Sequence, residues 1–155
     1  MQLASRSKRR SLSMRALVFL CAQLTCVNAN SEQSAVISVY HHVSTSTPAS
    51  TSLSPEAFRA HLRFLAENDF TVLPVTEIIG ELNRGGELPN KLVAITFDDG
   101  YESIYSTAFP LLQEFGFPFT VFISTGPIDR QQKGYMTWEQ LALLRDAGVI
   151  IGNHG

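Results

Sequence analysis

The stretch Leu92-Val93-Ala94-Ile95-Thr96-Phe97-Asp98-Asp99-Gly100 joins a nearly continuous apolar run to two adjacent carboxylates and a glycine. An apolar run without polar alternation is typical of a parallel strand that is covered on both faces. The two acids stand directly at the C-terminal end of that strand, where Gly100 allows the chain to turn sharply. The stretch therefore predicts a buried strand over residues 92–97 that ends in a candidate site.

Strand and helix patterns alternate on both sides of this stretch. Stretches rich in β-branched and aromatic residues predict further strands over residues 36–40, 70–73, 119–123 and from 149 onward. Apolar residues at helical spacing, together with cap signals, predict helices from Ser54 to near Asn68, from near Thr76 to Gly85, over 103–115 with an interruption at Pro110, and from Thr137 to Gly148. This alternation predicts right-handed βαβ units and a parallel α/β sheet, with a loop over residues 44–52.

Parallel sheets collect the loops that leave the C-terminal ends of their strands on one face. Asp98 and Asp99 follow one predicted strand and His154 follows another, so we expect two carboxylates and an imidazole to meet at one rim. A cation is the usual means of keeping adjacent carboxylates ionised, and a mixed oxygen and nitrogen ligand set favours zinc over calcium or magnesium. Three other interpretations stay open from these residues alone: a simple turn in which an Asp caps the next helix, a magnesium site for phosphoryl transfer, and a structural role for His154.

The N-terminal residues have the order of a secretory signal. Residues 1–15 contain five Lys and Arg and no acid, and an apolar stretch follows at 16–22. That stretch is shorter than the ~20 apolar residues that a bilayer-spanning helix needs. We therefore expect residues 1–29 to be a signal peptide cleaved after Ala29, and the chain to be exported to the periplasm or the extracellular side of the cell envelope. A disordered basic tail followed by a small buried helix is the alternative.

Cleavage at that position would change the chemistry of the chain. Cys21 and Cys26 both lie in the segment that would be removed, so neither a disulfide nor a thiolate would contribute to the mature protein. Lipid attachment at either cysteine is less favoured, because neither follows a run of Leu and small residues. Seven Lys and Arg would remain against fourteen Asp and Glu, a net charge of −7, which argues against a nucleic-acid partner. Residues 30–155 are enough for one modest domain.

Several stretches of the sequence resemble the NodB-type polysaccharide deacetylases, the fourth carbohydrate esterase family. Thr96-Phe97-Asp98-Asp99-Gly100 is similar to the first signature of that family. The other similar stretches run in the family's order and cover about residues 36 to 155; they are Tyr40-His41-His42-Val43, Ser54-Pro55-Glu56-Ala57-Phe58, Gly116-Phe117-Pro118-Phe119-Thr120-Val121-Phe122 and Met136-Thr137-Trp138-Glu139-Gln140-Leu141. The pattern most resembles the branch that deacetylates poly-β-1,6-N-acetylglucosamine in biofilm matrices.

The resemblance implies a role for each of the three rim residues. It implies that Asp98 is the general base, and that Asp99 and His154 are ligands of a divalent metal, zinc with cobalt or nickel as alternatives. The implied activity is hydrolysis of acetamido groups on a polysaccharide of N-acetylglucosamine units, with peripheral association with the membrane or cell envelope as a further expectation. His154 matches the first histidine of the family's second signature, where Gly155 replaces the usual Ser or Thr.

The same resemblance predicts that this sequence is an incomplete domain. The family's fold is a distorted (β/α)7–8 barrel, of which the chain would supply the first four or five βα units. A second metal histidine would fall near position 158, and a histidine that serves as general acid would come later still. We therefore expect residues 1–155 alone to be inactive. Two other functions stay open: a noncatalytic secreted carbohydrate-binding remnant, and a magnesium-dependent phosphatase.

Overall fold

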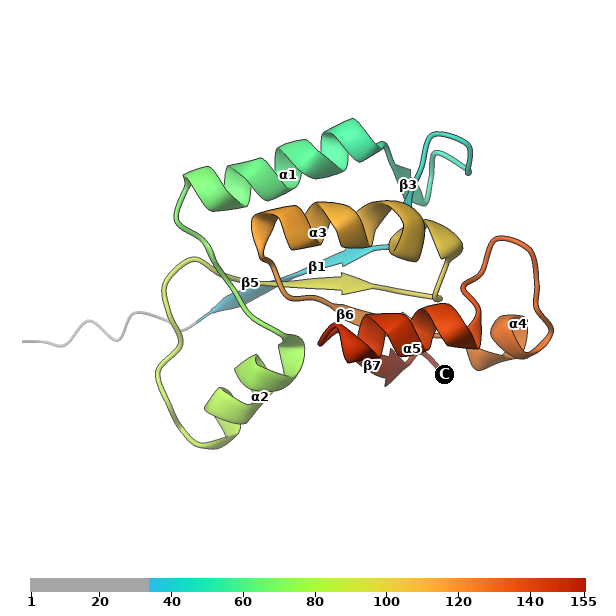
Figure 1. Ribbon diagram of the computed structural model, residues 1–155. Coiled ribbons are helices and arrows are strands. Elements are labelled where there is room, and N and C mark those ends of the chain that lie inside the picture. The colour runs from blue at the N-terminus through green and yellow to red at the C-terminus, as the bar shows by residue number, and fades with distance from the viewer. Residues whose placement is uncertain (1–33) are drawn as a thin grey trace, which may run out of the picture. The chain divides into compact units, whose positions relative to one another are not determined.

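The structure is a computed structural model that describes residues 34–155 (Figure 1). The predicted signal peptide at residues 1–29 and both cysteines lie outside the described residues. Strands and helices alternate along most of the chain, in the order β1 (Ala35–Tyr40), β2 (His42–Val43), β3 (Ser52–Leu53), α1 (Pro55–Glu67), β4 (Thr71–Val72), α2 (Val75–Asn83), β5 (Leu92–Phe97), the π-helix η1 (Ile104–Ala108), α3 (Phe109–Phe115), β6 (Thr120–Ile123), α4 (Thr125–Asp129), α5 (Trp138–Asp146) and β7 (Ile150–Asn153).

The main sheet is parallel throughout, which confirms the predicted α/β class. Its strands follow the order β1-β5-β6-β7, and β4 pairs with the beginning of β5. The register places Tyr40 at the end of β1 beside Phe97 at the end of β5, and Phe97 beside Val121 of β6. The C-terminal ends of β1 and β5 therefore lie next to each other, and the residues that follow them share one rim.

All six residues of β5 are buried, as the apolar run predicts. Side chains alternate between the two faces of a strand, and those of β5 belong to two separate hydrophobic clusters. Val93, Ile95 and Phe97 join the larger cluster, which contains buried residues of α1, η1, α3 and α5. Leu92 and Ala94 pack instead with Ile78 of α2. The strand before the acids is thus held on both faces.

The helices begin at the caps that the sequence indicates. The Ser54 side chain accepts a hydrogen bond from the Ala57 backbone N–H at 3.2 Å, and Pro55 occupies the first turn of α1. At the start of α5, Thr137 and Gln140 form a capping box with bonds of 3.2 Å and 2.9 Å. Figure 1 shows α1 beside α3, and the two helices contact each other over the larger hydrophobic cluster.

The interruption predicted at Pro110 is confirmed, since the helix over 103–115 divides into η1 and α3, with Pro110 in the first turn of α3. Three other features differ from the sequence-based expectations. The second predicted strand shortens to the two residues of β4. The predicted loop over 44–52 is flanked by the parallel pair of β2 and β3. Helix α4 was not predicted, because its five residues include a glycine and a proline.

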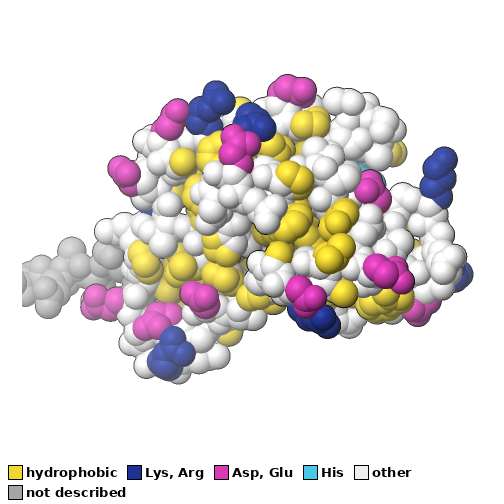
Figure 2. Space-filling view, in the orientation of Figure 1, with side chains coloured by type: hydrophobic (Ala, Val, Ile, Leu, Met, Phe, Trp, Pro, Cys, Tyr) yellow, Lys and Arg dark blue, Asp and Glu magenta, His cyan; other side chains and the backbone are white. Residues whose placement is uncertain are grey.

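Acidic side chains are spread over the face of the molecule shown in Figure 2, with hydrophobic side chains exposed between them. The described ion pairs include Arg59–Glu114, Arg84–Glu81 and Arg145–Asp146, all between solvent-exposed side chains. Such pairs contribute ~0–1 kcal/mol each to stability. Within residues 34–155, no helix has the length and apolar character needed to cross a membrane.

Candidate functional site

The two adjacent carboxylates occupy a tight turn at the end of β5. The backbone N–H of Asp98 donates to the carbonyl of Tyr40 at 2.9 Å, which ties the turn to the end of β1. The Gly100 N–H then donates back to the Asp98 carbonyl at 2.9 Å. Asp99 and Gly100 both have positive φ angles, 70° and 81°, which lie in the left-handed region of the backbone. Gly100 thus meets the predicted need for a residue without a side chain.

His154 reaches the same turn from the end of β7. Its backbone N–H donates to the carbonyl of Ile123 at the end of β6, at 3.0 Å. The imidazole Nε2 lies 3.5 Å from Asp98 Oδ2 and 3.9 Å from Asp99 Oδ1. The structure therefore brings together the three side chains that the sequence predicted to meet at one rim.

The three side chains are accessible to solvent. Asp98 and Asp99 are 23% and 24% exposed, and His154 is 40% exposed. Within the described residues, both carboxylates and the imidazole are therefore open to solvent.

Two neighbouring segments form hydrogen bonds with the backbone of this turn. The Ser124 N–H donates to the Asp99 carbonyl at 3.2 Å, and the Met136 N–H donates to the Gly100 carbonyl at 3.0 Å. A Cβ atom added at Gly100 would lie 3.2 Å from Ile123 Cγ2. The turn is therefore bonded to the segments after β6 and before α5 and packed closely on Ile123.

His42 and Tyr101, which we call the aromatic wall, lie beside the carboxylates. The His42 ring stacks on Tyr101 with a centroid distance of 3.7 Å, and Tyr101 contacts the Tyr135 ring at 4.8 Å. The backbones of Tyr101 and Tyr135 also form an antiparallel bridge. The sequence predictions missed Tyr101 and Tyr135, although Tyr101 directly follows Gly100.

The charge state of this wall follows from its surroundings. Hydrogen bonding with Tyr135, burial and the Asp99 carboxylate all raise the pKa of Tyr101, so its phenol stays protonated at neutral pH. Burial and the nearby His41 lower the pKa of His42, against the opposing effect of Asp99. His42 is only 8% exposed, and its Nδ1 has no hydrogen-bond partner among the described residues. The wall is therefore neutral beside two carboxylates.

The donor set can be tested against a metal centre. Two carboxylates and an imidazole are the ligand types that zinc accepts. Catalytic zinc sites use about three protein ligands, so if Asp98 is reserved as a base, Asp99 and His154 leave the set one ligand short. Within residues 34–155, no group of three or more His, Cys, Asp or Glu has the arrangement of a metal site. The donor types fit a divalent metal, and with Asp98 set aside as a base two of the three donors remain.

Comparisons with known proteins point to one family. Residues 85–155 match the family model described as polysaccharide deacetylase. The chain is 36% identical over 119 residues to the poly-β-1,6-N-acetyl-D-glucosamine N-deacetylase of Escherichia coli strain K12, covering 66% of this chain. It is 30% identical over 93 residues to the enzyme of the same name from Staphylococcus aureus, covering 60% of this chain.

The fold agrees with these sequence matches. The solved structure of IcaB from Ammonifex degensii superposes on 79% of this chain with a TM-score of 0.71 and 30% sequence identity. The matched part covers 53% of that structure, 17% of the E. coli enzyme and 32% of the S. aureus enzyme, so the chain spans only part of the length of each. By the sequence of residues 85–155 and by fold, this chain resembles the polysaccharide deacetylase family.

Proposed function

We propose that the complete gene product is a metal-dependent N-deacetylase that acts on a polysaccharide of N-acetylglucosamine units. The observation that carries this proposal is the meeting of Asp98, Asp99 and His154 at one solvent-accessible rim. The names of the E. coli and S. aureus relatives support N-acetylglucosamine polymers as the substrate class.

Each rim residue has a distinct task in this proposal. Asp99 and His154 hold a divalent metal, for which zinc fits best and cobalt or nickel are alternatives. When bound, such an ion supplies Lewis-acid stabilisation of the negative charge that develops on the acetyl carbonyl oxygen. Asp98 accepts the proton of the attacking water at its carboxylate, which is the work of a general base.

The surroundings of Asp98 suit a base that works on a bound substrate. Its backbone is fixed by the bond to Tyr40, and its carboxylate is 23% exposed, so an attacking water can reach it. The neutral wall of His42 and Tyr101 closes one side of the site without adding a charge that would compete for the carboxylates. The proton for the leaving amine is assigned to a group outside the described residues.

The proposal also covers location and completeness. We propose that residues 1–29 direct export to the periplasm or the outside of the cell envelope. We further propose that residues 1–155 alone bind metal weakly and release no acetate at a useful rate, because Asp99 and His154 are one ligand short of a catalytic site. Metal-dependent acetate release by the purified 155-residue chain would contradict this second part.

The decisive experiment compares two Asp→Asn variants of the complete gene product. Asp98→Asn removes the base and should lower acetate release from a partially acetylated N-acetylglucosamine polymer by ~10²-fold or more. Asp146→Asn, at an exposed carboxylate of α5, should leave the rate unchanged. A base role is excluded if the Asp98→Asn protein keeps wild-type activity. Hydrolysis of aryl phosphates that depends on Asp98, without acetate release, would favour a phosphatase instead.

A further inference from the structure

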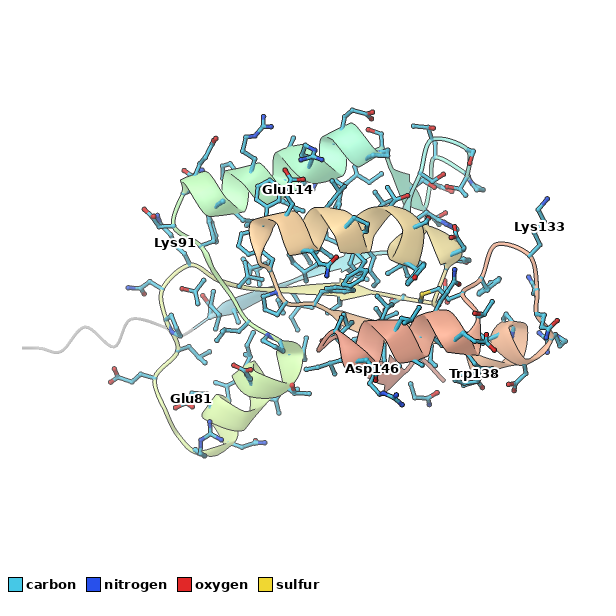
Figure 3. All side chains as sticks on the ribbon, in the orientation of Figure 1. Glu81, Lys91, Glu114, Lys133, Trp138 and Asp146 are labelled. Carbon is cyan, nitrogen blue, oxygen red and sulfur yellow. The ribbon has the colours of Figure 1, made fainter. Side chains whose placement is uncertain are left out.

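A second feature lies on the segment between α4 and α5. A cavity of about 360 Å³ opens there, within the ~300–1,000 Å³ range of ligand sites. The residues that line it include Asp129, Gln132, Tyr135, Thr137, Trp138 and Glu139. We call it the Trp138 cavity. Figure 3 shows Trp138 at the start of α5 and Lys133 on the loop between α4 and α5.

Trp138 is held in place but not covered. Its indole N–H donates to Asp129 Oδ1 at 3.0 Å, which links α5 to the end of α4 and fixes the ring. The side chain nevertheless remains 47% exposed, among the largest exposed hydrophobic side chains of the described residues. Packing of α5 therefore uses only part of the ring surface. The exposed face of the indole is available for stacking. Because the ring is already fixed, a ligand that binds there costs little further side-chain conformational entropy.

The polar lining of the cavity complements that face. Gln132 and Glu139 supply amide and carboxylate groups around the indole. The backbone N–H of Glu139 and the Thr137 side chain lower the pKa of the Glu139 carboxyl, so it is an acceptor at neutral pH. A pyranose ring has the matching chemistry, since it presents apolar C–H faces for stacking and a rim of hydroxyl groups for hydrogen bonds.

The cavity is connected to the rim by a pair of tyrosines. Tyr135 lines the cavity, and its ring contacts Tyr101 at 4.8 Å. Tyr101 follows the Asp99-Gly100 turn, and the Met136 N–H donates to the Gly100 carbonyl at 3.0 Å. A polymer chain bound at the carboxylates can therefore continue past the tyrosine pair toward Trp138.

From these contacts we propose that the Trp138 cavity is a glycan subsite, in which Trp138 stacks on a sugar unit removed from the one that is deacetylated. The proposal rests on the proposed function for its choice of polymer. It predicts that affinity rises with the length of the oligosaccharide, because only a chain that extends from the rim to Trp138 contacts both.

The sequence offers a direct probe of this subsite. Trp138 is the single tryptophan of the 155-residue chain, so its fluorescence reports on this position alone. Titration of that chain with N-acetylglucosamine oligomers, at a protein concentration low enough to keep it dispersed, should give a saturable change in tryptophan emission. Long oligomers should produce the change at lower concentration than the monosaccharide. An unchanged emission at saturating long oligomer overturns the proposal.

Kinetics of the complete gene product provide the second measurement. Trp138→Ala should raise KM for long oligomers about tenfold, with little change in kcat, and should leave the shortest substrates unaffected. Trp138→Phe keeps an aromatic face and should restore most of the loss. Phe64→Ala, at an exposed aromatic residue of α1, is the matched control and should change neither constant. Equal KM values for Trp138→Ala and wild type on long oligomers overturn the subsite.

These readouts separate the subsite from the deacetylase proposal. A fluorescence response of the 155-residue chain, with no acetate release by the complete gene product, supports the subsite and contradicts the proposed activity. Acetate release by the complete gene product, with no fluorescence response of the 155-residue chain, does the reverse. A stacking role also differs from a purely structural one, since the loss of a purely structural side chain in Trp138→Ala would affect short and long substrates equally.

Discussion

Asp99 has two properties that are seldom combined in one residue. Its carboxylate faces the rim beside His154, and its backbone has a φ of 70°. Only glycine visits this region freely, and Asp and Asn are among the few other residues that tolerate it. The bond from the Ser124 N–H to the Asp99 carbonyl helps to hold this conformation. Position 99 therefore requires both a side chain that can act at the rim and a residue that tolerates a left-handed backbone.

The metal assignments predict a specific pattern of binding. Asp99→Asn and His154→Ala should each weaken zinc binding by the complete gene product at least about tenfold, because each removes a ligand or its charge. Asn is chosen at position 99 because it tolerates the left-handed backbone. Asp98→Asn should retain zinc while it loses activity. Chelator competition measures the affinities, and a loss of zinc in Asp98→Asn as large as in Asp99→Asn would make Asp98 a ligand rather than a base.

Gly100 predicts a stability difference between two glycine substitutions. Gly116, at the end of α3, also has a left-handed backbone, with a φ of 66°, but nothing lies within 4 Å of an added Cβ. Gly116→Ala should cost ~1–2 kcal/mol of unfolding free energy from the backbone alone. Gly100→Ala should cost about 1 kcal/mol more, since its Cβ also crowds Ile123. Urea denaturation measures both, and equal losses would show that Ile123 moves aside freely.

At the scale of an element, helix α5 depends on its first turn. Thr137→Ala removes the side-chain acceptor of the capping box and should lower the unfolding free energy by ~1 kcal/mol. Thr137→Ser keeps an oxygen in the same place and should retain most of the stability. Thermal unfolding of the two variants at equal concentration checks this. Equal destabilisation by Ala and Ser would mean that the methyl group of Thr137, not its hydroxyl, stabilises the helix start.

The elements with a strong local signal were predictable from sequence. Ser54 and Thr137 stand before apolar residues at helical spacing, and residues 92–97 are apolar without a break, so both helix starts and the central strand follow from local rules. The β2–β3 pair was not predictable, because backbone bonds such as His42 N–H to the Thr51 carbonyl form it within a stretch rich in Ser and Thr. Its pairing is set by the tertiary fold.

From the sequence, only the part of the candidate site that lies at the ends of strands was predictable. The C-terminal ends of parallel strands collect their loops on one face, and this rule placed Asp98, Asp99 and His154 together. Tyr101 and Tyr135 meet through a single antiparallel bridge between two loops. No periodicity marks such a bridge in the sequence, so the aromatic wall and the Trp138 cavity beside it emerge only from the three-dimensional structure.

At the scale of the whole molecule, strand β1 is an exposed edge of the sheet. Within residues 34–155 it pairs on one side only, with β5, and Val36, Ile37 and Val39 are each more than half exposed. An apolar edge strand with unpaired backbone groups is a template for pairing with another chain. We therefore expect the 155-residue chain to self-associate as its concentration rises, which sedimentation velocity can follow.

A pair of lysine substitutions tests whether β1 causes that association. Ile37→Lys places a charge on the edge strand and should shift the chain toward monomer. Leu82→Lys introduces the same charge at a comparably exposed apolar position on α2 and should have much less effect. If both variants suppress association equally, general solubility is responsible. A wild-type chain that stays monomeric and unfolds in one sharp transition would remove the premise.

The full burial of β5 also determines when the Asp98-Asp99 turn is lost during unfolding. Amide hydrogens of a strand that is paired on both sides and covered on both faces exchange with solvent only when the sheet opens as a unit. The Asp98 amide belongs to this slow class, because it is bonded to Tyr40 across the end of the sheet. The carboxylate turn is thus anchored to the segment that opens last. Fraying of peripheral helices therefore leaves the Asp98-Asp99 turn in place.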